Sequence, residues 1–417
     1  MTAEAVVRAT HTRIREAPWD VLPSIRPELL AALEFVLSGQ AAETTLDRLL
    51  RAHRDWSSEQ RRMAAEALFG VGLWRRRLAH LAGEPGAAAL LDTYVRDLAG
   101  TPAPFSDFPD WPTALSWPEW LADHVRTELL GNDSEAMALC ATMNLKGPIT
   151  ARINPLLTTR DALRAELTAQ GLQTTAATHS PLAFHFDTRP NVLGLPAHRE
   201  GRFEIQDEGS QLLGLLLQAK PDESVLDLCA GAGGKTLLLA AEMENRGLLY
   251  AFDTDLKKVG RLEQRTRQAR VTNVRPLYAL PPTLRCDRIF VDAPCSALGV
   301  LRRGPDVRFR IAPETLTALL EVQAGLLDTA ARHLHERGRI VYATCTLNRA
   351  ENEAQVEAFL GRHPDFHPIA PAGVPADTTD GLAFRCLPHR HGTDGFYAAV
   401  LERDLSSRSD AAPIPMR

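Results

Sequence analysis

Four short apolar runs, separated by helical stretches, alternate through the second half of this 417-residue chain. They read VLDL, LLYAF, DRIFVDA and GRIVYAT, and the long stretch before the last of them carries leucines at helical spacing. Short buried strands that alternate with helices are typical of a mostly parallel sheet covered by helices. The sequence therefore predicts an α/β domain over residues 203–404, which the segment FRCLPHRHGTDGFYAAVLER would close with further strands.

The N-terminal third has a different composition, because it holds all six tryptophans of the chain. Residues 27–95 are rich in alanine and leucine at helical spacing, which predicts an all-α domain over residues 1–100. Five prolines in residues 101–118 predict a linker. Residues 119–202 combine two amphipathic helical patterns with a strand and a capped helix, and so predict a small α+β segment, whereas residues 405–417 predict a flexible tail.

Charge and cysteine usage limit the class of protein. The formal net charge of −5 gives no global attraction for polyanions, so a nucleic-acid site would need a local basic patch. The six cysteines include no CxxC pair, and the spacing of Cys386, His389 and His391 suits no common metal site, so we expect neither disulfides nor bound metal. The first 22 residues are charged and no window approaches about 18 consecutive apolar residues. We therefore expect a cytoplasmic monomer without a signal peptide or a membrane segment.

Two of the cysteines directly follow predicted strands. Cys295 comes shortly after Asp292 in VDAPCS, and Cys345 follows the run that ends in YAT. The carboxyl ends of parallel strands are where such sheets present catalytic groups. The segment from Asn348 to Glu351 has the pattern of a capping box, so we expect a helix to begin directly after Cys345. The free amides and the dipole of that helix would favour the thiolate form of this cysteine.

A thiolate with a neighbouring acid suits chemistry on a pyrimidine ring. Addition of a thiolate to carbon 6 of cytosine makes carbon 5 nucleophilic enough to attack an electrophilic methyl group. Asp292 could share a proton with the ring nitrogen and disperse the charge that the addition creates. The alternative is that both cysteines are small apolar residues at the ends of buried strands. The presence of two cysteines, each in a motif of its own, favours catalysis.

The motifs DAPCS and ATCT, with CAGAGGKT upstream, resemble those of the Sun/Nop family of RNA 5-methylcytosine methyltransferases, of the bacterial ribosomal RNA type. With SWPEWLADHV, ARIN and FEIQDEGSQ, the resemblance covers residues 115–403. It implies a Rossmann-like class I methyltransferase domain preceded by an RNA-binding α+β segment. It also implies that Cys345 is the nucleophile, that Cys295 helps to release the product and that Asp292 is the acid. The residues alone do not decide which cysteine attacks.

The segment VLDLCAGAGGKT predicts a strand, a glycine-rich turn and a helix, an arrangement that binds nucleotides. A P-loop would need glycine in place of Cys229, and a dinucleotide loop would need glycine in place of Thr236. Together with the cysteine motifs, the turn predicts an S-adenosylmethionine site in which Asp253 binds the ribose hydroxyls. The predicted cofactor-binding residues are Cys229, Ala230, Gly231, Ala232, Gly233, Gly234, Lys235, Asp253 and Asp292. The family's acid near the adenine is missing from VRPLYALPPTLR, which leaves the backbone or Leu280 and its neighbours for that contact.

Four arginines follow the Pro-Cys motif within nine residues and predict contacts with RNA phosphates. They are Arg302, Arg303, Arg308 and Arg310, and Arg152 and Asn154 of ARIN are two further candidates for RNA binding. The alternatives are a solvated loop and a strand with polar surface residues. The segment EALFGVGLWRRRLAHL also resembles part of an antitermination-factor-like RNA-binding domain.

The resemblance implies an enzyme that transfers a methyl group from S-adenosylmethionine to carbon 5 of a cytosine in RNA, through a covalent cysteine adduct. Ribosomal RNA is the favoured substrate, and its target cytosine must be unpaired or flipped out of a duplex to expose carbon 6. Two alternatives stay open. One is transfer RNA as the substrate, and the other is a degenerate methyltransferase that acts as an RNA-binding or ribosome-assembly protein.

Overall fold

The computed structural model describes residues 3–304 and 306–403, and it divides into two compact units. The helical unit comprises the chain up to Gly147 together with Val300–Pro313. The α/β unit comprises Pro148–Gly299 and the chain from Glu314 onward. Residues 405–417, predicted to form a flexible tail, lie outside the described residues. Every helix in the described ranges is too short or too polar to traverse a lipid bilayer.

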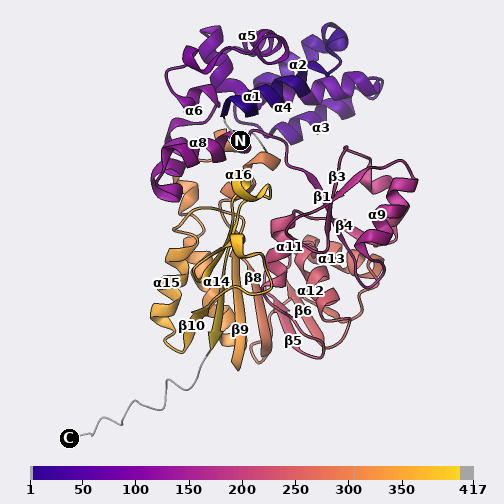
Figure 1. Ribbon diagram of the computed structural model, residues 1–417, viewed down its shortest axis with the longest axis vertical. Coiled ribbons are helices and arrows are strands. Elements are labelled where there is room, and N and C mark those ends of the chain that lie inside the picture. The colour runs from indigo at the N-terminus through magenta and orange to yellow at the C-terminus, as the bar shows by residue number, and fades with distance from the viewer. Residues whose placement is uncertain (1–2, 305, 404–417) are drawn as a thin grey trace, which may run out of the picture. The chain divides into compact units, whose positions relative to one another are not determined.

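The helical unit is built around α4, Ser58–Ala82, one of the indigo to purple helices in Figure 1. Ser57 begins α4 with a reciprocal cap, since its hydroxyl accepts from the Gln60 amide while the Gln60 side chain accepts from the Ser57 amide. Gly83 ends the helix at φ 76°, in the left-handed region. The buried face of α4 packs against α2 (Leu22–Leu37), α3 (Ala42–Ala52) and α5 (Ala87–Tyr94), and α1 (Ala3–Arg15) packs on η2 (Val95–Gly100).

Residues 101–118 are folded rather than extended. The side chain of Trp117 is 1% exposed, and its indole donates to the carbonyl oxygen of Cys140 at 3.1 Å. Burial of this ring holds the proline-rich segment against the helices that follow it, so the division between the units falls after Gly147 and not at residue 118. The helices of this part are η3 Phe105–Asp107, α6 Trp111–Ala114, α7 Glu119–His124, η4 Val125–Leu130 and α8 Asp133–Thr142.

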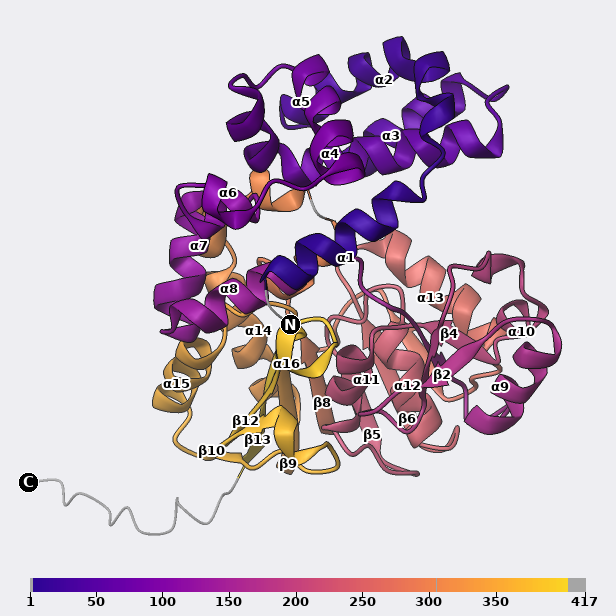
Figure 2. The same cartoon turned by 45° about the horizontal axis from the view of Figure 1, so that its top comes forward.

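The α/β unit begins with a small antiparallel sheet of order β2-β3-β1-β4. Its strands are β1 Ile149–Ile153, β2 Thr174–Ala176, β3 Ala183–Phe186 and β4 Phe203–Ile205. The rings of Phe184, Phe186 and Phe203 pack with centroids between 5.3 and 6.1 Å apart. Figure 2 shows α9 (Arg160–Ala169) and α10 (Pro196–Arg199) beside this sheet, where α9 contacts β2 and β3.

The larger sheet has the order β11-β12-β13-β9-β8-β5-β6-β7, with β10 paired to β13. Strands β5 to β9 are parallel, and β13 runs antiparallel beside β9, so the predicted mostly parallel sheet is confirmed. The strands are β5 Ser224–Asp227, β6 Leu248–Phe252, β7 Val274–Leu277, β8 Cys286–Asp292, β9 Leu334–Thr344, β10 Phe366–Ile369, β11 Thr379–Asp380, β12 Ala383–Cys386 and β13 Phe396–Arg403.

Helices accompany this sheet as the α/β pattern predicts. They are α11 Glu208–Leu215, α12 Gly234–Glu242, α13 Leu256–Gln268, α14 Leu320–His333, α15 Glu353–Arg362 and α16 Pro388–His391. α14 packs with α15 and contacts β8 and β9, whereas α11 packs with α12, which contacts β6 (Figure 1). Strand β5 lies between β6 and β8, so the strand order reverses there. Sheets of this kind bind ligands at that switch point, beyond the carboxyl ends of the strands.

Candidate active site

The residues beyond the carboxyl ends of β5, β6, β8 and β9 line a cavity of about 460 Å³ in the α/β unit. Six residues predicted from the sequence lie in its wall: Cys229, Gly231, Asp253, Asp292, Cys295 and Cys345. Strands β8 and β9 are parallel neighbours, with Asp292 opposite Ala343, so the two cysteine loops leave the sheet side by side. The sheet topology thus joins motifs that are 50 residues apart in the chain.

The two cysteines meet in this cavity. Cys295 Sγ and Cys345 Sγ are 3.4 Å apart, close enough for one thiol to donate a hydrogen bond to the other. The hydrogen bond with Cys345, together with burial, raises the pKa of Cys295 well above its ordinary value. Cys295 is therefore held as a thiol that can donate to the sulfur of Cys345. The backbone carbonyl of Cys345 accepts a second bond between the loops, from the Gly299 amide at 3.0 Å.

The expectation that a helix begins directly after Cys345 is wrong. Helix α15 begins only at Glu353, and the preceding Asn352 makes no side-chain cap. The Asn348 side chain donates to Glu351 Oε1 at 3.0 Å and accepts from the Ala350 amide at 3.3 Å, but no helical turn follows directly. Cys345 therefore does not lie at the N-terminus of α15.

A lysine supplies the positive charge near the cysteines. Lys235, in the first turn of α12, donates from Nζ to Asp292 Oδ2 at 2.7 Å. Burial lowers the pKa of Lys235, but attraction to Asp292 and to the sulfur of Cys345 raises it overall above the ordinary value. The ammonium group thus stays charged. It orients the carboxylate of Asp292 at the wall of the cavity that holds both cysteines.

The glycine-rich turn adopts a backbone that requires glycine. Gly231 and Gly233 have φ values of 56° and 91°, and a Cβ on Gly233 would lie 2.3 Å from a methyl carbon of Leu262. The Gly231 amide donates to Asp253 Oδ2 at 2.9 Å, and the Asp255 amide donates to Oδ1 at 2.8 Å. These bonds fix the Asp253 carboxylate at the cavity wall, with lone pairs left for the hydroxyls of a ribose. The turn and this carboxylate fit the cofactor that the sequence predicts.

Other parts of the cofactor loop have supporting roles. Burial raises the pKa of Cys229 well above its ordinary value, so this residue lines the cavity as a neutral thiol. The apolar wall comes from Phe252, Val322 and Leu326. Leu280, which the sequence suggested for the adenine side, packs against the hydrophobic core and is not among the residues that line the cavity. These three residues have the apolar surface that a flat heterocyclic ring requires. The sequence does not distinguish them from ordinary core positions.

Arg152 and Asn154, predicted to contact RNA, are buried and bind the protein itself. Arg152 donates to the carbonyl oxygen of Gly234 at 2.7 Å and to the Gln206 side chain, and burial lowers its pKa to about 10. The Asn154 side chain donates to the carbonyl oxygens of Gly201 and Ala269 at 3.0 and 2.9 Å. Both residues therefore join the small sheet to the larger sheet, so these hydrogen-bond partners are internal, and RNA contacts from them stay a prediction.

Sequence reasoning also missed Arg265. Its guanidinium donates to the carbonyl oxygen of Ala232 at 2.6 Å and pairs with Glu204 at 2.8 Å. Arg152 and Arg265 thus bind two backbone carbonyls of the glycine-rich loop, those of Gly234 and Ala232. Arg265 lies among the charged residues of α13, where nothing in the pattern separates it from a solvated position.

The arginine-rich segment after Cys295 belongs to the helical unit. Arg308 is fully buried and donates to Asn144 Oδ1 at 2.5 Å and to the Met143 carbonyl at 3.2 Å, with its guanidinium 4.1 Å from the ring centre of Trp117. Burial lowers its pKa to about 9. The Arg308 side chain is thus engaged inside the helical unit, which does not favour the phosphate contact predicted for it.

The other three arginines differ in exposure. Arg302 is only 8% exposed, which also argues against a phosphate contact there. Arg310 pairs with Asp306 at 3.0 Å and stays partly exposed, and Arg303 is exposed. The local cluster predicted from the sequence is thus divided between internal and surface positions.

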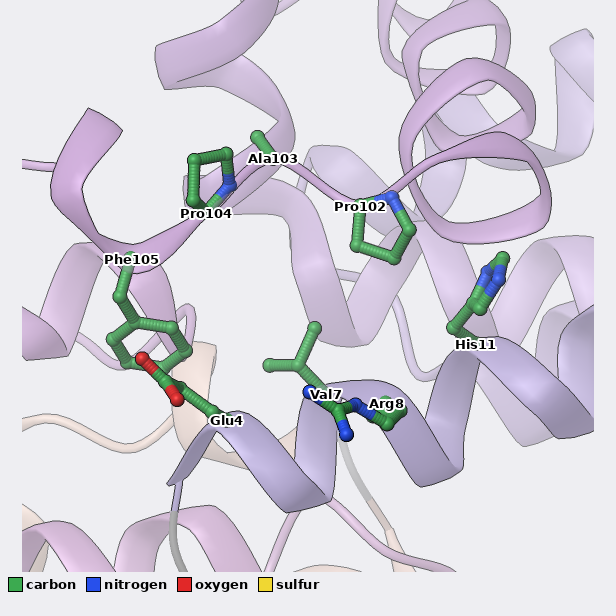
Figure 3. Close-up of a pocket in the computed structure, with 8 residues that line it drawn as sticks. All are labelled: Glu4, Val7, Arg8, His11, Pro102, Ala103, Pro104 and Phe105. Carbon is green, nitrogen blue, oxygen red and sulfur yellow. The ribbon is translucent and has the colours of Figure 1, made fainter.

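A second cavity, of about 400 Å³, lies in the helical unit between α1 and the proline-rich segment (Figure 3). Its wall carries Glu4, Arg8 and His11 beside Pro102 and Phe105. It holds no cysteine and no pair of acids, so the chemistry predicted from the sequence has no counterpart there. Within residues 3–304 and 306–403, no group of histidine, cysteine and acidic side chains is arranged to bind a metal ion.

Comparison with known proteins matches this arrangement. A family model described as 16S rRNA methyltransferase RsmB/F matches residues 214–402, and a model of the ferredoxin-like domain of RsmF/B-like methyltransferases matches residues 117–193. The chain is 35% identical over 301 residues to a probable ribosomal RNA small subunit methyltransferase B of Synechocystis sp., covering 69% of this chain and 67% of that protein.

Two further proteins extend the comparison. A probable ribosomal RNA small subunit methyltransferase B of Bacillus subtilis is 30% identical over 344 residues, covering 78% of this chain and 76% of that protein. The crystal structure of a methyltransferase homolog protein from Pyrococcus horikoshii is 25% identical and superposes with a TM-score of 0.61, covering 70% of this chain and 98% of that one.

Proposed function

This chain belongs to the RsmB/F family of 16S rRNA methyltransferases and uses S-adenosylmethionine, and we propose that it methylates carbon 5 of a cytosine in small-subunit ribosomal RNA through a covalent adduct to Cys345. The observation that carries the proposal is the 3.4 Å separation of the sulfurs of Cys295 and Cys345 in a cavity that also holds Asp292. Two thiols and an acid in one cavity match the needs of covalent catalysis on a pyrimidine.

The chain's own residues divide the reaction among them. Cys345 Sγ forms a bond to carbon 6 of the cytosine while the proton of its thiol passes to the ring nitrogen. Asp292, oriented by Lys235, accepts a hydrogen bond from that N–H and so stabilises the neutral adduct. Bound against the glycine-rich turn, S-adenosylmethionine supplies the electrophilic methyl group. A base then takes the proton of carbon 5, the freed electron pair forms the double bond between carbons 5 and 6, and the sulfur of Cys345 leaves with the electrons of its bond to carbon 6. Cys295, 3.4 Å away, assists by donating a hydrogen bond from its thiol to that leaving sulfur.

The recessed position of Cys345 sets a requirement on the substrate. A stacked and paired cytosine cannot bring carbon 6 to a sulfur inside a cavity, so the target is an unpaired or flipped nucleotide, at a cost of a few kcal/mol. Among the predicted phosphate contacts, Arg303 is exposed, whereas Arg308 is buried, so Arg303 is the better candidate.

The test is transfer of a labelled methyl group from S-adenosylmethionine to small-subunit RNA, with transfer RNA alongside, and detection of 5-methylcytidine after digestion. We expect product with the wild type, neither product nor adduct with Cys345→Ala, and an RNA–protein adduct on a denaturing gel with Cys295→Ala. Cys386→Ala, a buried cysteine on β12, is the matched control and should retain activity. Full activity of Cys345→Ala would exclude this nucleophile, and RNA binding without cofactor consumption would favour an assembly protein.

A further inference from the structure

A buried carboxylate outside the cavity connects the two cysteine loops. Glu351 is 0% exposed and does not line the cavity. Its Oε2 accepts from the Ser296 amide at 2.8 Å and from Gln323 Nε2 at 2.9 Å. Its Oε1 accepts from the Ser296 hydroxyl at 2.5 Å and from Asn348 Nδ2 at 3.0 Å. Four donors from three different segments thus converge on one side chain.

These donors flank both sulfurs. Ser296 directly follows Cys295, and its hydroxyl also bonds to Thr346, the residue after Cys345, at 2.8 Å. Asn348 lies three residues beyond Cys345, and Gln323 donates to the Pro294 carbonyl at 2.9 Å, directly before Cys295. One hydrogen bond therefore separates Glu351 from each cysteine segment: the bond to Ser296 on the Cys295 side and the bond to Asn348 on the Cys345 side.

No regular structure holds the loops themselves. Residues 293–297 and 345–348 lie outside helices and strands. Ala297, two residues after Cys295, has a φ of 59°, a left-handed conformation that a residue with a Cβ adopts only when its surroundings impose it. The bonds of the neighbouring Ser296 to Glu351 provide such a constraint. Without them, the Cys295 loop keeps the bond from Gly299 to the Cys345 carbonyl but loses the constraint closest to Ala297.

We propose that Glu351 is the positioning residue that sets the separation of the Cys295 and Cys345 sulfurs. It acts through Ser296 and Asn348 and does not touch the substrate. The consequence for catalysis rests on the proposed function, because Cys295 can assist release only when it lies beside the sulfur that carries the adduct. Loss of the carboxylate should therefore impair release more than cofactor binding.

The first measurement reads the geometry without any RNA. Diamide, a mild thiol oxidant, takes two electrons and two protons from the two thiols and becomes a hydrazine, while Cys295 and Cys345 form a disulfide. In Glu351→Gln the amide nitrogen faces the donors of Ser296, Gln323 or Asn348, so the loops separate. We expect disulfide formation, measured as the cross-linked peptide pair by mass spectrometry, to slow by about tenfold or more. Ser296→Ala, which removes only a hydroxyl, should give a smaller slowing in the same direction.

The matched control is Glu208→Gln. Glu208 is 3% exposed in the same unit and accepts from the backbone amides of His179 and Ser180, away from the cysteine loops. Its variant should form the disulfide at the wild-type rate. A Glu351→Gln rate within twofold of the wild type, or an equal slowing in Glu208→Gln, would overturn the positioning role.

The second measurement follows the reaction. We expect Glu351→Gln to bind S-adenosylmethionine within about threefold of the wild type while turnover falls on the order of 100-fold and the RNA adduct accumulates. Glu351→Asp, which keeps the charge, should recover part of the turnover. If disulfide formation slows as expected but neither the variant nor the wild type forms an RNA adduct, the positioning role stands and the proposed function fails.

Discussion

Asp227 ends β5 as a fully buried carboxyl group beside the cofactor loop. The pKa of Asp227 is raised to about 7, chiefly by burial and further by the nearby Asp292. The hydrogen bond from Thr236 at 2.7 Å lowers the pKa but does not offset these two effects. Its Oδ1 has no hydrogen-bond partner within the described ranges of the chain. The neutral acid is therefore the form that the native state prefers at mildly acid pH.

This preference predicts a stability that falls as pH rises. The unfolded residue titrates near 3.8, so between that pH and about 7 the native state holds a proton that the unfolded state has lost. The contribution of Asp227 to the free energy of unfolding is complete below the pKa of the unfolded state. It disappears as pH rises through the pKa of the native state. In Asp227→Asn this dependence should vanish, so that the variant gains on the order of a few kcal/mol relative to the wild type between about pH 4 and pH 7. Urea unfolding at several pH values measures the difference, and parallel curves for the two proteins would contradict it.

Single residues also mark the limit of what the sequence could predict. The cysteines and Asp292 were identifiable because they stand in two short motifs, each at the end of an apolar run. Glu351 was misread as a helix cap, because an Asn-x-x-Glu pattern is the same whether its carboxylate accepts from its own helix or from Ser296 on another strand's loop. Only the parallel pairing of β8 with β9 decides between the two.

At the scale of elements, the small sheet supports the cofactor loop. Arg152 on β1 and Glu204 on β4 both act on the turn after β5, the first directly and the second through Arg265. Arg152 and Asn154, predicted to contact RNA, are buried and donate to backbone carbonyls of the protein. A polar residue on a short strand gives no sequence signal of which sheet face it occupies until the neighbouring unit is placed.

This support predicts the effect of Arg152→Met, which keeps most of the side-chain volume but leaves the Gly234 carbonyl without its donor. We expect the free energy of unfolding to fall by about 2–3 kcal/mol and the dissociation constant of S-adenosylmethionine to rise severalfold. The salt dependence of RNA binding should stay as in the wild type, since a lost phosphate contact would reduce its slope by about one. Calorimetric cofactor binding and a salt titration measure the two effects.

Arg288→Met provides the matched control for that variant. Arg288 pairs with Glu223 at 2.6 Å in the same unit and makes no contact with the glycine-rich turn. Its loss should lower stability by a similar amount while cofactor affinity stays unchanged. An equal loss of cofactor affinity in both variants would show that Arg152 acts only through global stability.

At the scale of the whole molecule, the sequence predicted the class of each part but not the path of the chain. The alternating apolar runs indicated the α/β sheet, and the alanine-rich helical spacing indicated the bundle. The return of Val300–Pro313 into the helical unit had no sequence signal, because Arg308 in a charged loop is indistinguishable from a surface arginine. Its partners, Asn144 and Trp117, lie more than a hundred residues earlier in the chain.

The return segment predicts that the α/β unit is not independently stable as the bare fragment 148–417. Without residues 1–147, Arg308 loses Asn144, Met143 and Trp117, and the arginine-rich segment 300–313 loses the groups against which it packs. We expect the fragment to unfold at a lower temperature than the full chain and to aggregate. Replacing residues 300–313 of the fragment with a Gly-Ser loop should raise its thermal midpoint and solubility. If the unmodified fragment proved as stable and soluble as the replaced one, the segment would not need its helical partner.

The same return has a consequence during synthesis on the ribosome. The helices up to Gly147 emerge first, yet the side chain that occupies the position beside Trp117 is made only when Val300–Pro313 has left the exit tunnel. At about 5–20 residues per second, that interval lasts roughly 8–30 s. During that interval Asn144, the Met143 carbonyl and Trp117 lack the Arg308 guanidinium. The helical unit, although synthesised largely before the α/β unit, is therefore completed only late in synthesis.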